Sequence, residues 1–120
     1  DSIRYAHERA QFGRTISNYQ LIQAKVANMA VDLEASRLLT YKASHMIDDK
    51  KEALKEASMA KYFATEAACR AGDQIMRIFG AYGYSMEYSA QRYYRDNRFL
   101  LYGGGTHEIL QPNIAKWVGL

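Results

Sequence analysis

The sequence predicts an all-α fold, an antiparallel bundle of the four-helix type with long helices. Segments 17–47 and 53–78 carry apolar residues at intervals of three and four, which is the spacing of one helical face. A polar turn at 48–51 separates the two segments, so they are expected to lie antiparallel. No stretch alternates between apolar and polar residues strongly enough to indicate a strand, and no internal repeat occurs.

The first helix is expected to be truncated. Residues 3–10 read as the last turns of a helix already under way, so we expect the chain to be a piece of a longer polypeptide. Ser17 is the expected N-cap of the first long helix, because its hydroxyl can accept from the first free amides. The buried face of that helix is predicted to consist of Ile22, Val26, Met29 and Leu33.

The second long helix is predicted to pack closely, because small residues line its apolar face. These residues are Ala53, Ala57, Ala60, Ala64, Ala67, Ala71, Ile75 and Ile78. Gly80 and Gly83 are expected to end this helix. A shorter helix is expected around 86–97 and a last one at 106–118.

Length and composition indicate one globular domain over 1–120, with 48% hydrophobic residues for its core. The 16 basic and 13 acidic residues are scattered, so no block of one sign predicts nucleic-acid or membrane binding. Cys69 is the only cysteine, which excludes an internal disulfide, leaves no thiol cluster for a metal and favours a reducing compartment. No apolar run approaches the ~20 residues of a membrane span.

A run of three glycines at 103–105 lies immediately before Thr106, which is placed to open the last helix. Glycines allow positive φ and a close approach of the backbone to another molecule. The Thr106 hydroxyl can cap the helix, and the first helical amides point outward as donors. This is the pattern of a ligand-facing turn, and the alternative is a plain flexible connection between two helices.

Two further motifs precede this turn. Residues 8–13 read ERAQFG and are followed by YQLI at 19–22. Residues 78–84 read IFGAYGY and lead into 87–96. The order, spacing and helical setting of the three motifs resemble the C-terminal helical domain of the acyl-CoA dehydrogenases, and the resemblance covers essentially the whole chain.

The resemblance implies flavin chemistry on an acyl-CoA substrate. In that family, FAD takes a hydride from the β-carbon of the thioester while a carboxylate removes the α-proton, which gives a trans-2-enoyl-CoA. It also implies an electron-transfer flavoprotein as acceptor, a homo-oligomer (dimer or tetramer), and a bacterial cytoplasmic or mitochondrial matrix location. Because the flavin platform lies outside these residues, the 120-residue chain alone is expected to be inactive.

The first motif is expected to bind the cofactor. The resemblance places Arg9 at the FAD pyrophosphate of a neighbouring subunit, with Gln11 and Phe12 beside it. Tyr19 and Ile22 correspond to contacts around the adenosine half. The alternative from the residues alone is that Arg9 caps the carbonyls of the preceding helix and Phe12 belongs to the core.

The second motif departs from the family pattern at two cofactor positions. Arg77 stands where the family has a glutamine, and it can still meet a phosphate. Gly80 and Ala81 stand where the family has a glycine pair. Because Ala81 adds a methyl group where the backbone normally approaches the nucleotide, that contact is expected to be shifted or lost.

The glycine turn contains no catalytic residue by this comparison. Many members have the glutamate that removes the α-proton where Gly104 stands, so the base is expected upstream of residue 1, as in some members. Gly103 and Gly104 are then next to the substrate. Thr106 and Glu108 are assigned to the cofactor, Glu108 because the family uses a polar side chain there.

Other functions stay open at this stage. An acyl-CoA oxidase relative has the same bundle and passes its electrons to oxygen. A non-catalytic assembly subunit would explain why Gly104 and Ala81 depart from the pattern. A free-standing helical interaction module explains the bundle but not the three ordered motifs.

Overall fold

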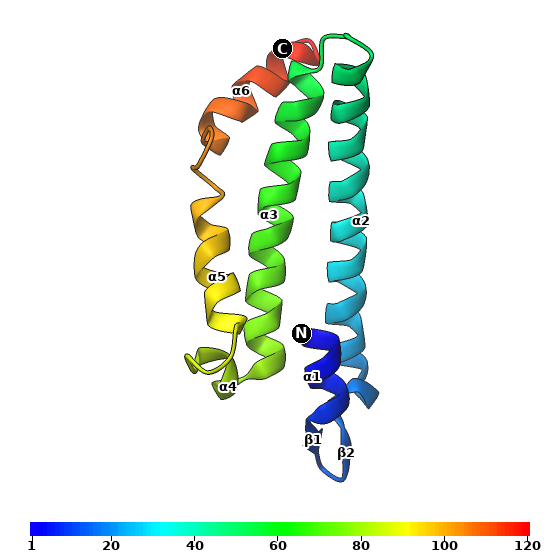
Figure 1. Ribbon diagram of the computed structural model, residues 1–120, viewed down its shortest axis with the longest axis vertical. Helices are drawn as coiled ribbons and strands as arrows, with labels where there is room; N and C mark the ends of the chain where they lie inside the picture. Colours follow the sequence, from blue (N-terminus) through cyan, green and yellow to red (C-terminus); the bar gives the residue numbers. More distant parts are fainter.

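The computed structural model describes all 120 residues and consists almost entirely of helices (Figure 1). In chain order the elements are α1 (Ser2–Glu8), β1 (Ala10–Gln11), β2 (Arg14–Thr15), the 3-10 helix η1 (Ile16–Asn18), α2 (Gln20–Asp48), α3 (Leu54–Phe79), α4 (Ala81–Tyr84), α5 (Ala90–Phe99) and α6 (His107–Trp117). The predicted all-α class is confirmed.

Helix α3 is the central element of an elongated molecule that measures 55 × 27 × 23 Å. It contacts α2 along one side and α5 and α6 along the other. Figure 1 shows α2 and α3 running antiparallel, with α5 and α6 following each other up the opposite side of α3. The short α1 contacts the ends of α2 and α3 that lie near the β-hairpin.

Most of the small-residue face predicted for this helix is buried. Ala53, at the N-cap of α3, and Ala60, Ala67, Ile75 and Ile78 are each 7% exposed or less, whereas Ala57, Ala64 and Ala71 are half-buried. The helix ends at Phe79, and Gly80 follows with a φ of 59°, a conformation that glycine adopts without strain. The observed end of this helix therefore matches the prediction to within a residue.

The start of α2 differs from the prediction. Ser17 is not the N-cap, because η1 precedes α2 and Tyr19 occupies that position. The Ser17 hydroxyl instead pairs with that of Thr15 at 2.8 Å. The prediction that Leu33 is buried is also wrong: Leu33 is 51% exposed, because the face of α2 turned toward α3 passes through Asp32, which pairs with Arg70 of α3, and not through Leu33. Ile22, Val26 and Met29 are half-buried and pack against the core cluster.

The prediction that no strand occurs is wrong at one place. β1 and β2 pair antiparallel, with Ala10 opposite Thr15 and Gln11 opposite Arg14. The two loop residues, Phe12 and Gly13, have φ values of 51° and 79°, as a two-residue hairpin with both central residues at positive φ requires. Strands of two residues are too short to give an alternating pattern, so they cannot be predicted from the sequence.

The core cluster lies at the hairpin end of the molecule and joins α1, η1, α3 and α5. The rings of Tyr5 and Phe79 stack with centroids 4.0 Å apart, and Tyr88 meets both edge-on. The Tyr5 hydroxyl donates to the Phe79 carbonyl at 3.4 Å. This cluster fixes the helix from which the hairpin emerges.

Replacing Gly72 by valine is expected to destabilise the fold by about 1–3 kcal/mol, the usual cost of overpacking. A Cβ at Gly72 would lie 3.3 Å from the Tyr94 Cα, so α5 has to move away from α3. Urea denaturation followed by circular dichroism measures the effect. Ala30→Val, at an exposed position of α2, is the control for the helix propensity of valine. Equal losses for the two variants would contradict close packing at Gly72.

Candidate functional site

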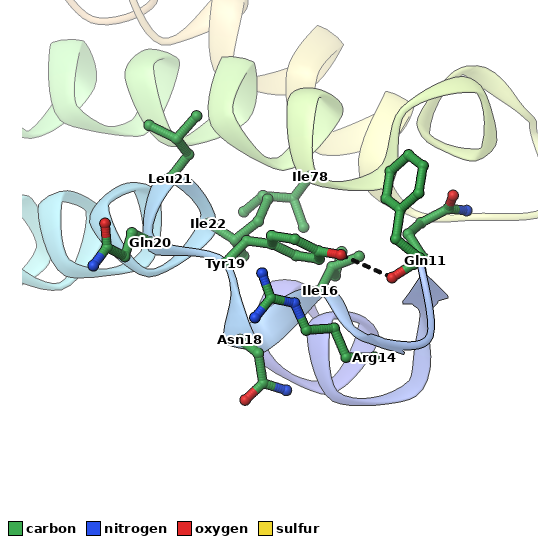
Figure 2. A pocket seen from close by; sticks show the side chains of 10 residues that line it. Gln11, Arg14, Ile16, Asn18, Tyr19, Gln20, Leu21, Ile22 and Ile78 are labelled. Carbon is green, nitrogen blue, oxygen red and sulfur yellow. Dashed lines mark hydrogen bonds between the residues drawn. The ribbon is translucent and has the colours of Figure 1, made fainter.

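An open hollow of about 650 Å³ lies between the hairpin, η1, the first turn of α2 and the end of α3. Figure 2 shows its lining, with Ile22 and Ile78 on the side of the helices and Arg14 and Asn18 on the side of the hairpin. The Tyr19 hydroxyl points across to the hairpin and donates to the Gln11 carbonyl at 2.8 Å. This bond ties the hairpin to the start of α2.

Phe12, at the tip of the hairpin, is the most unusual residue of this region. Its side chain is 93% exposed, and its φ of 51° is unfavourable for a residue with a Cβ. A bulky aromatic side chain held away from the core in a strained conformation is typical of a contact surface rather than of a packed interior. The alternative that Phe12 belongs to the core is therefore wrong.

Arg9 is the C-cap of α1, and its side chain lies next to Tyr82 and Gln11. Its guanidinium lies 5.2 Å from the Tyr82 ring centroid. In the favourable orientation of the Gln11 amide, the side-chain oxygen accepts from Arg9 at 2.7 and 3.3 Å. The alternative was that the Arg9 side chain caps α1. At this end of the helix, it is the backbone N–H of Arg9 that donates to the Tyr5 carbonyl. The side chain is thus left for another partner.

Arg14 is a site residue that the sequence analysis missed. Its guanidinium lies 4.2 Å from the centroid of the Tyr19 ring, on the wall of the hollow. Neither Arg14 nor Arg9 has a carboxylate within ion-pair distance. A second arginine directly after the Phe-Gly pair was the signal in the sequence. Two uncompensated guanidinium groups favour an anionic partner.

Apart from Ile78, the residues of the second motif do not line the hollow. Arg77 is exposed and donates to Asp73 at 2.6 Å, and this hydrogen bond holds the pKa of Arg77 above its ordinary range. A Cβ at Gly80 would meet nothing within 4 Å, so glycine is required there by its positive φ. The Ala81 methyl group is exposed. Of this motif, only Ile78 reaches the hollow.

The glycine turn lies between α5 and α6. Gly104 and Gly105 have φ values of 73° and 112°, so both occupy the left-handed region that favours glycine. A Cβ at Gly103 would lie 2.7 Å from the Phe99 ring, while one at Gly104 would have only Lys61 nearby, at 3.8 Å. The turn therefore depends on its glycines both for its conformation and for space.

Thr106 takes the N-cap position of α6, as predicted, but its hydroxyl makes no hydrogen bond to a helix amide. The predicted side-chain cap is wrong. The backbone amide of Glu108 and, to a lesser degree, the nearby Thr106 hydroxyl lower the pKa of the Glu108 carboxyl. Glu108 is exposed and carries its negative charge at the N-terminus of α6.

Most of the candidate site residues fall into two separate groups. We call Arg9, Gln11, Phe12, Arg14 and Tyr19 the hairpin surface, and 103–108 the glycine-turn surface. The hairpin surface lies beside Ile78 of α3, whereas the glycine turn is bonded to α3 near Thr65. Residues 65 and 78 are roughly 20 Å apart along the helix, at a rise of about 1.5 Å per residue.

Two kinds of site are not found in the structure. No helix has the combination of length and apolar character needed to cross a membrane. No three His, Cys, Asp or Glu side chains lie close enough together to hold a metal ion.

Residues 1–119 match the family described as acyl-CoA dehydrogenase, C-terminal domain, and the chain belongs to this family. The predicted family is thereby confirmed. The chain is 52% identical to benzylmalonyl-CoA dehydrogenase of Aromatoleum aromaticum and 44% identical to 3-(aryl)acrylate reductase of Clostridium sporogenes. It is also 44% identical to the CarC subunit of the caffeyl-CoA reductase-Etf complex of Acetobacterium woodii. These alignments cover 96–98% of this chain.

The chain spans only about a third of the length of these relatives, 31%, 31% and 30% in turn. Solved structures superpose closely. The prolyl acyl carrier protein oxidase AnaB matches with a TM-score of 0.96 and 39% identity over 99% of this chain and 32% of its own. The FAD complex of PigA matches with a TM-score of 0.95 and 28% identity over 99% of this chain and 31% of its own.

Proposed function

We propose that residues 1–120 are the C-terminal domain of an FAD-dependent acyl-CoA dehydrogenase that acts on the α,β-bond of an acyl-CoA thioester. The observation that carries the proposal is the hairpin surface. It has two guanidinium groups without carboxylate partners beside an exposed aromatic ring. A pyrophosphate joined to an aromatic base and a flavin presents the charges and rings that such a surface binds.

The separation of the two surfaces supports a homo-oligomer. The glycine-turn surface and the hairpin surface lie roughly 20 Å apart along α3. We infer that they face different cofactor molecules, with the hairpin surface directed to the FAD of a neighbouring subunit. The extreme exposure of Phe12 agrees with a contact to another chain.

Each residue then has a defined task. Bound FAD would supply the hydride acceptor for the acyl β-carbon. Arg9 would neutralise pyrophosphate oxygens, with Gln11 holding the guanidinium in place. Gly103 and Gly104 would let the thioester approach the backbone, and Thr106 would face the cofactor together with Glu108. Because Gly104 has no side chain, the base that removes the α-proton lies elsewhere in the full protein.

The substrate class proposed is an acyl group with an aromatic ring. Three of the relatives bear names that specify such compounds: benzylmalonyl-CoA, (aryl)acrylate and caffeyl-CoA. The absence of a side chain at Gly104, where a Cβ would have only Lys61 nearby, at 3.8 Å, leaves room that a bulky acyl group needs. The Etf complex of the CarC relative supports an electron-transfer flavoprotein as acceptor. A bacterial cytoplasm or a mitochondrial matrix is the proposed location, because relatives come from bacteria and from mitochondria.

A second candidate is a non-catalytic assembly subunit, which the missing side chain at Gly104 favours. A third is an oxidase, since AnaB is an acyl carrier protein oxidase. All three candidates keep the same bundle and cofactor surface, so the discriminating property is the reaction of the bound flavin.

The test is anaerobic addition of 3-phenylpropionyl-CoA to the full-length protein, with butyryl-CoA as the matched aliphatic substrate. The aromatic thioester is expected to bleach the flavin absorbance more strongly at equal concentration. A protein that purifies without flavin contradicts the proposed class. Bound flavin that neither thioester bleaches favours the assembly subunit. Rapid peroxide formation on admitting air identifies an oxidase.

A further inference from the structure

His107 turns away from the surface that its two neighbours occupy. Glu108 is exposed, whereas the His107 side chain is only 12% exposed and is directed onto α3. Its Nδ1 lies 3.0 Å from the Glu66 carboxylate, and its Nε2 lies 2.8 Å from the Thr65 hydroxyl. Both ring nitrogens are therefore held by adjacent residues of one helix.

Further contacts fix the same junction. The Tyr62 ring lies 4.7 Å from the imidazole centroid, and its hydroxyl accepts from Gln111 at 3.0 Å. Gln111 is one helical turn after His107, so the first turn of α6 meets α3 at two points. On the other side of the glycines, Lys61 donates to the Leu100 carbonyl at 2.8 Å. One short segment of α3 thus holds both ends of the turn.

These hydrogen bonds restrict the backbone conformational freedom of the glycines. Three consecutive glycines have many backbone conformations, and each must be restricted before Thr106 and Glu108 take defined positions. Tying the residue between them to α3 supplies that restriction without occupying the outer surface.

We propose that His107, held by Thr65 and Glu66, is a positioning residue that fixes Thr106 and Glu108 against the bound cofactor. We call these three residues, Thr65, Glu66 and His107, the His107 anchor. The inference rests on the proposed function, because it assigns the outer surface of the turn to FAD.

The chemistry of the anchor defines graded variants. An ionised carboxylate only accepts hydrogen bonds, so Nδ1 carries the hydrogen that Glu66 receives. Glu66→Gln keeps an accepting oxygen, whereas Glu66→Ala removes it. His107→Ala removes both bonds to α3. Glu52→Ala, at an exposed glutamate without an ion pair, is the matched control.

The experiment uses the full-length holoenzyme and three readouts: amide hydrogen exchange, FAD affinity, and kcat against KM. His107→Ala and Glu66→Ala are expected to speed exchange in peptides covering 103–108 by about tenfold, with α2 unchanged. They are also expected to weaken FAD binding by about tenfold, the effect of one lost charged hydrogen bond. The loss of cofactor position should lower kcat more than it raises KM. Glu66→Gln should recover most of each effect, and Glu52→Ala should show none.

Unchanged exchange at 103–108 in both alanine variants overturns the inference, because the anchor would then not hold the turn. Faster exchange with wild-type FAD affinity and kcat also overturns it, since the contact would be structural only. If His107→Ala does not fold, the comparison of Glu66→Ala with Glu66→Gln decides. A wild-type protein that retains no FAD refutes the proposed function first, and the inference fails with it.

Discussion

Replacing Phe79 with alanine is expected to lower the free energy of unfolding by about 3–5 kcal/mol, the range for truncating a buried phenylalanine. Phe79 is 5% exposed and stacks on Tyr5, and its carbonyl accepts a hydrogen bond from the Tyr5 hydroxyl. The vacated space lies where α1, α3 and α5 meet, so neighbouring rings cannot fill it without moving a helix. Urea denaturation followed by circular dichroism gives the free energy directly.

Phe12→Ala is the matched control, because it makes the same chemical change at a side chain that is 93% exposed. Its effect on stability is expected to stay within about 0.5 kcal/mol of wild type, as for other surface substitutions. A loss below about 1 kcal/mol for Phe79→Ala would mean that the core tolerates the cavity, contrary to the packing described.

Arg9→Ala is expected to weaken FAD binding in the full-length protein by about ten- to a hundredfold, corresponding to roughly 1.5–3 kcal/mol for a charged hydrogen bond. The guanidinium has no carboxylate partner, so its removal should cost little stability within the domain. Because Arg9 is proposed to reach a neighbour's cofactor, oligomer stability should fall together with flavin content.

Flavin absorbance after extensive dialysis and sedimentation velocity measure the two effects. Arg4→Ala is the control: it removes an exposed arginine of α1, the helix that ends just before Arg9, and this arginine pairs with Asp1 at 3.4 Å. Arg4→Ala should keep wild-type flavin content and assembly. Wild-type flavin retention by Arg9→Ala would exclude a pyrophosphate contact for this residue.

The helices could be predicted from the sequence because their signal is local and repeated. The small residues of α3 recur every three or four positions, and Gly80 marks the end of the helix. Leu33 was misplaced because it lies next to the buried face of α2 and fits a spacing of three to four residues as well as that face does. Asp32 lies on the side of α3 and pairs with Arg70, and Ala43 further along α2 is buried, whereas Leu33 is exposed.

The site was only partly predictable. The hairpin depends on one pair of loop residues at positive φ, and its two-residue strands are too short to show an alternating pattern in the sequence. Ser17 has the chemistry of an N-cap, but Ile16 enters the core, and the backbone continues as a 3-10 turn. The His107 anchor joins residues more than forty positions apart, a contact that only the folded chain creates. Arg9 and Phe12 could be singled out from the sequence because their motif is contiguous.

The closed geometry of the hairpin determines how it meets a partner. The Ile16 amide donates to the Arg9 carbonyl at 2.8 Å and closes the base of the loop, and the Tyr19 hydroxyl holds Gln11 from the side. Phe12 is consequently presented in one backbone conformation before any partner arrives. The loss of chain entropy in this loop occurs during folding, so the proposed docking onto a neighbouring subunit is expected to be a rigid-body encounter that needs no further ordering of this loop.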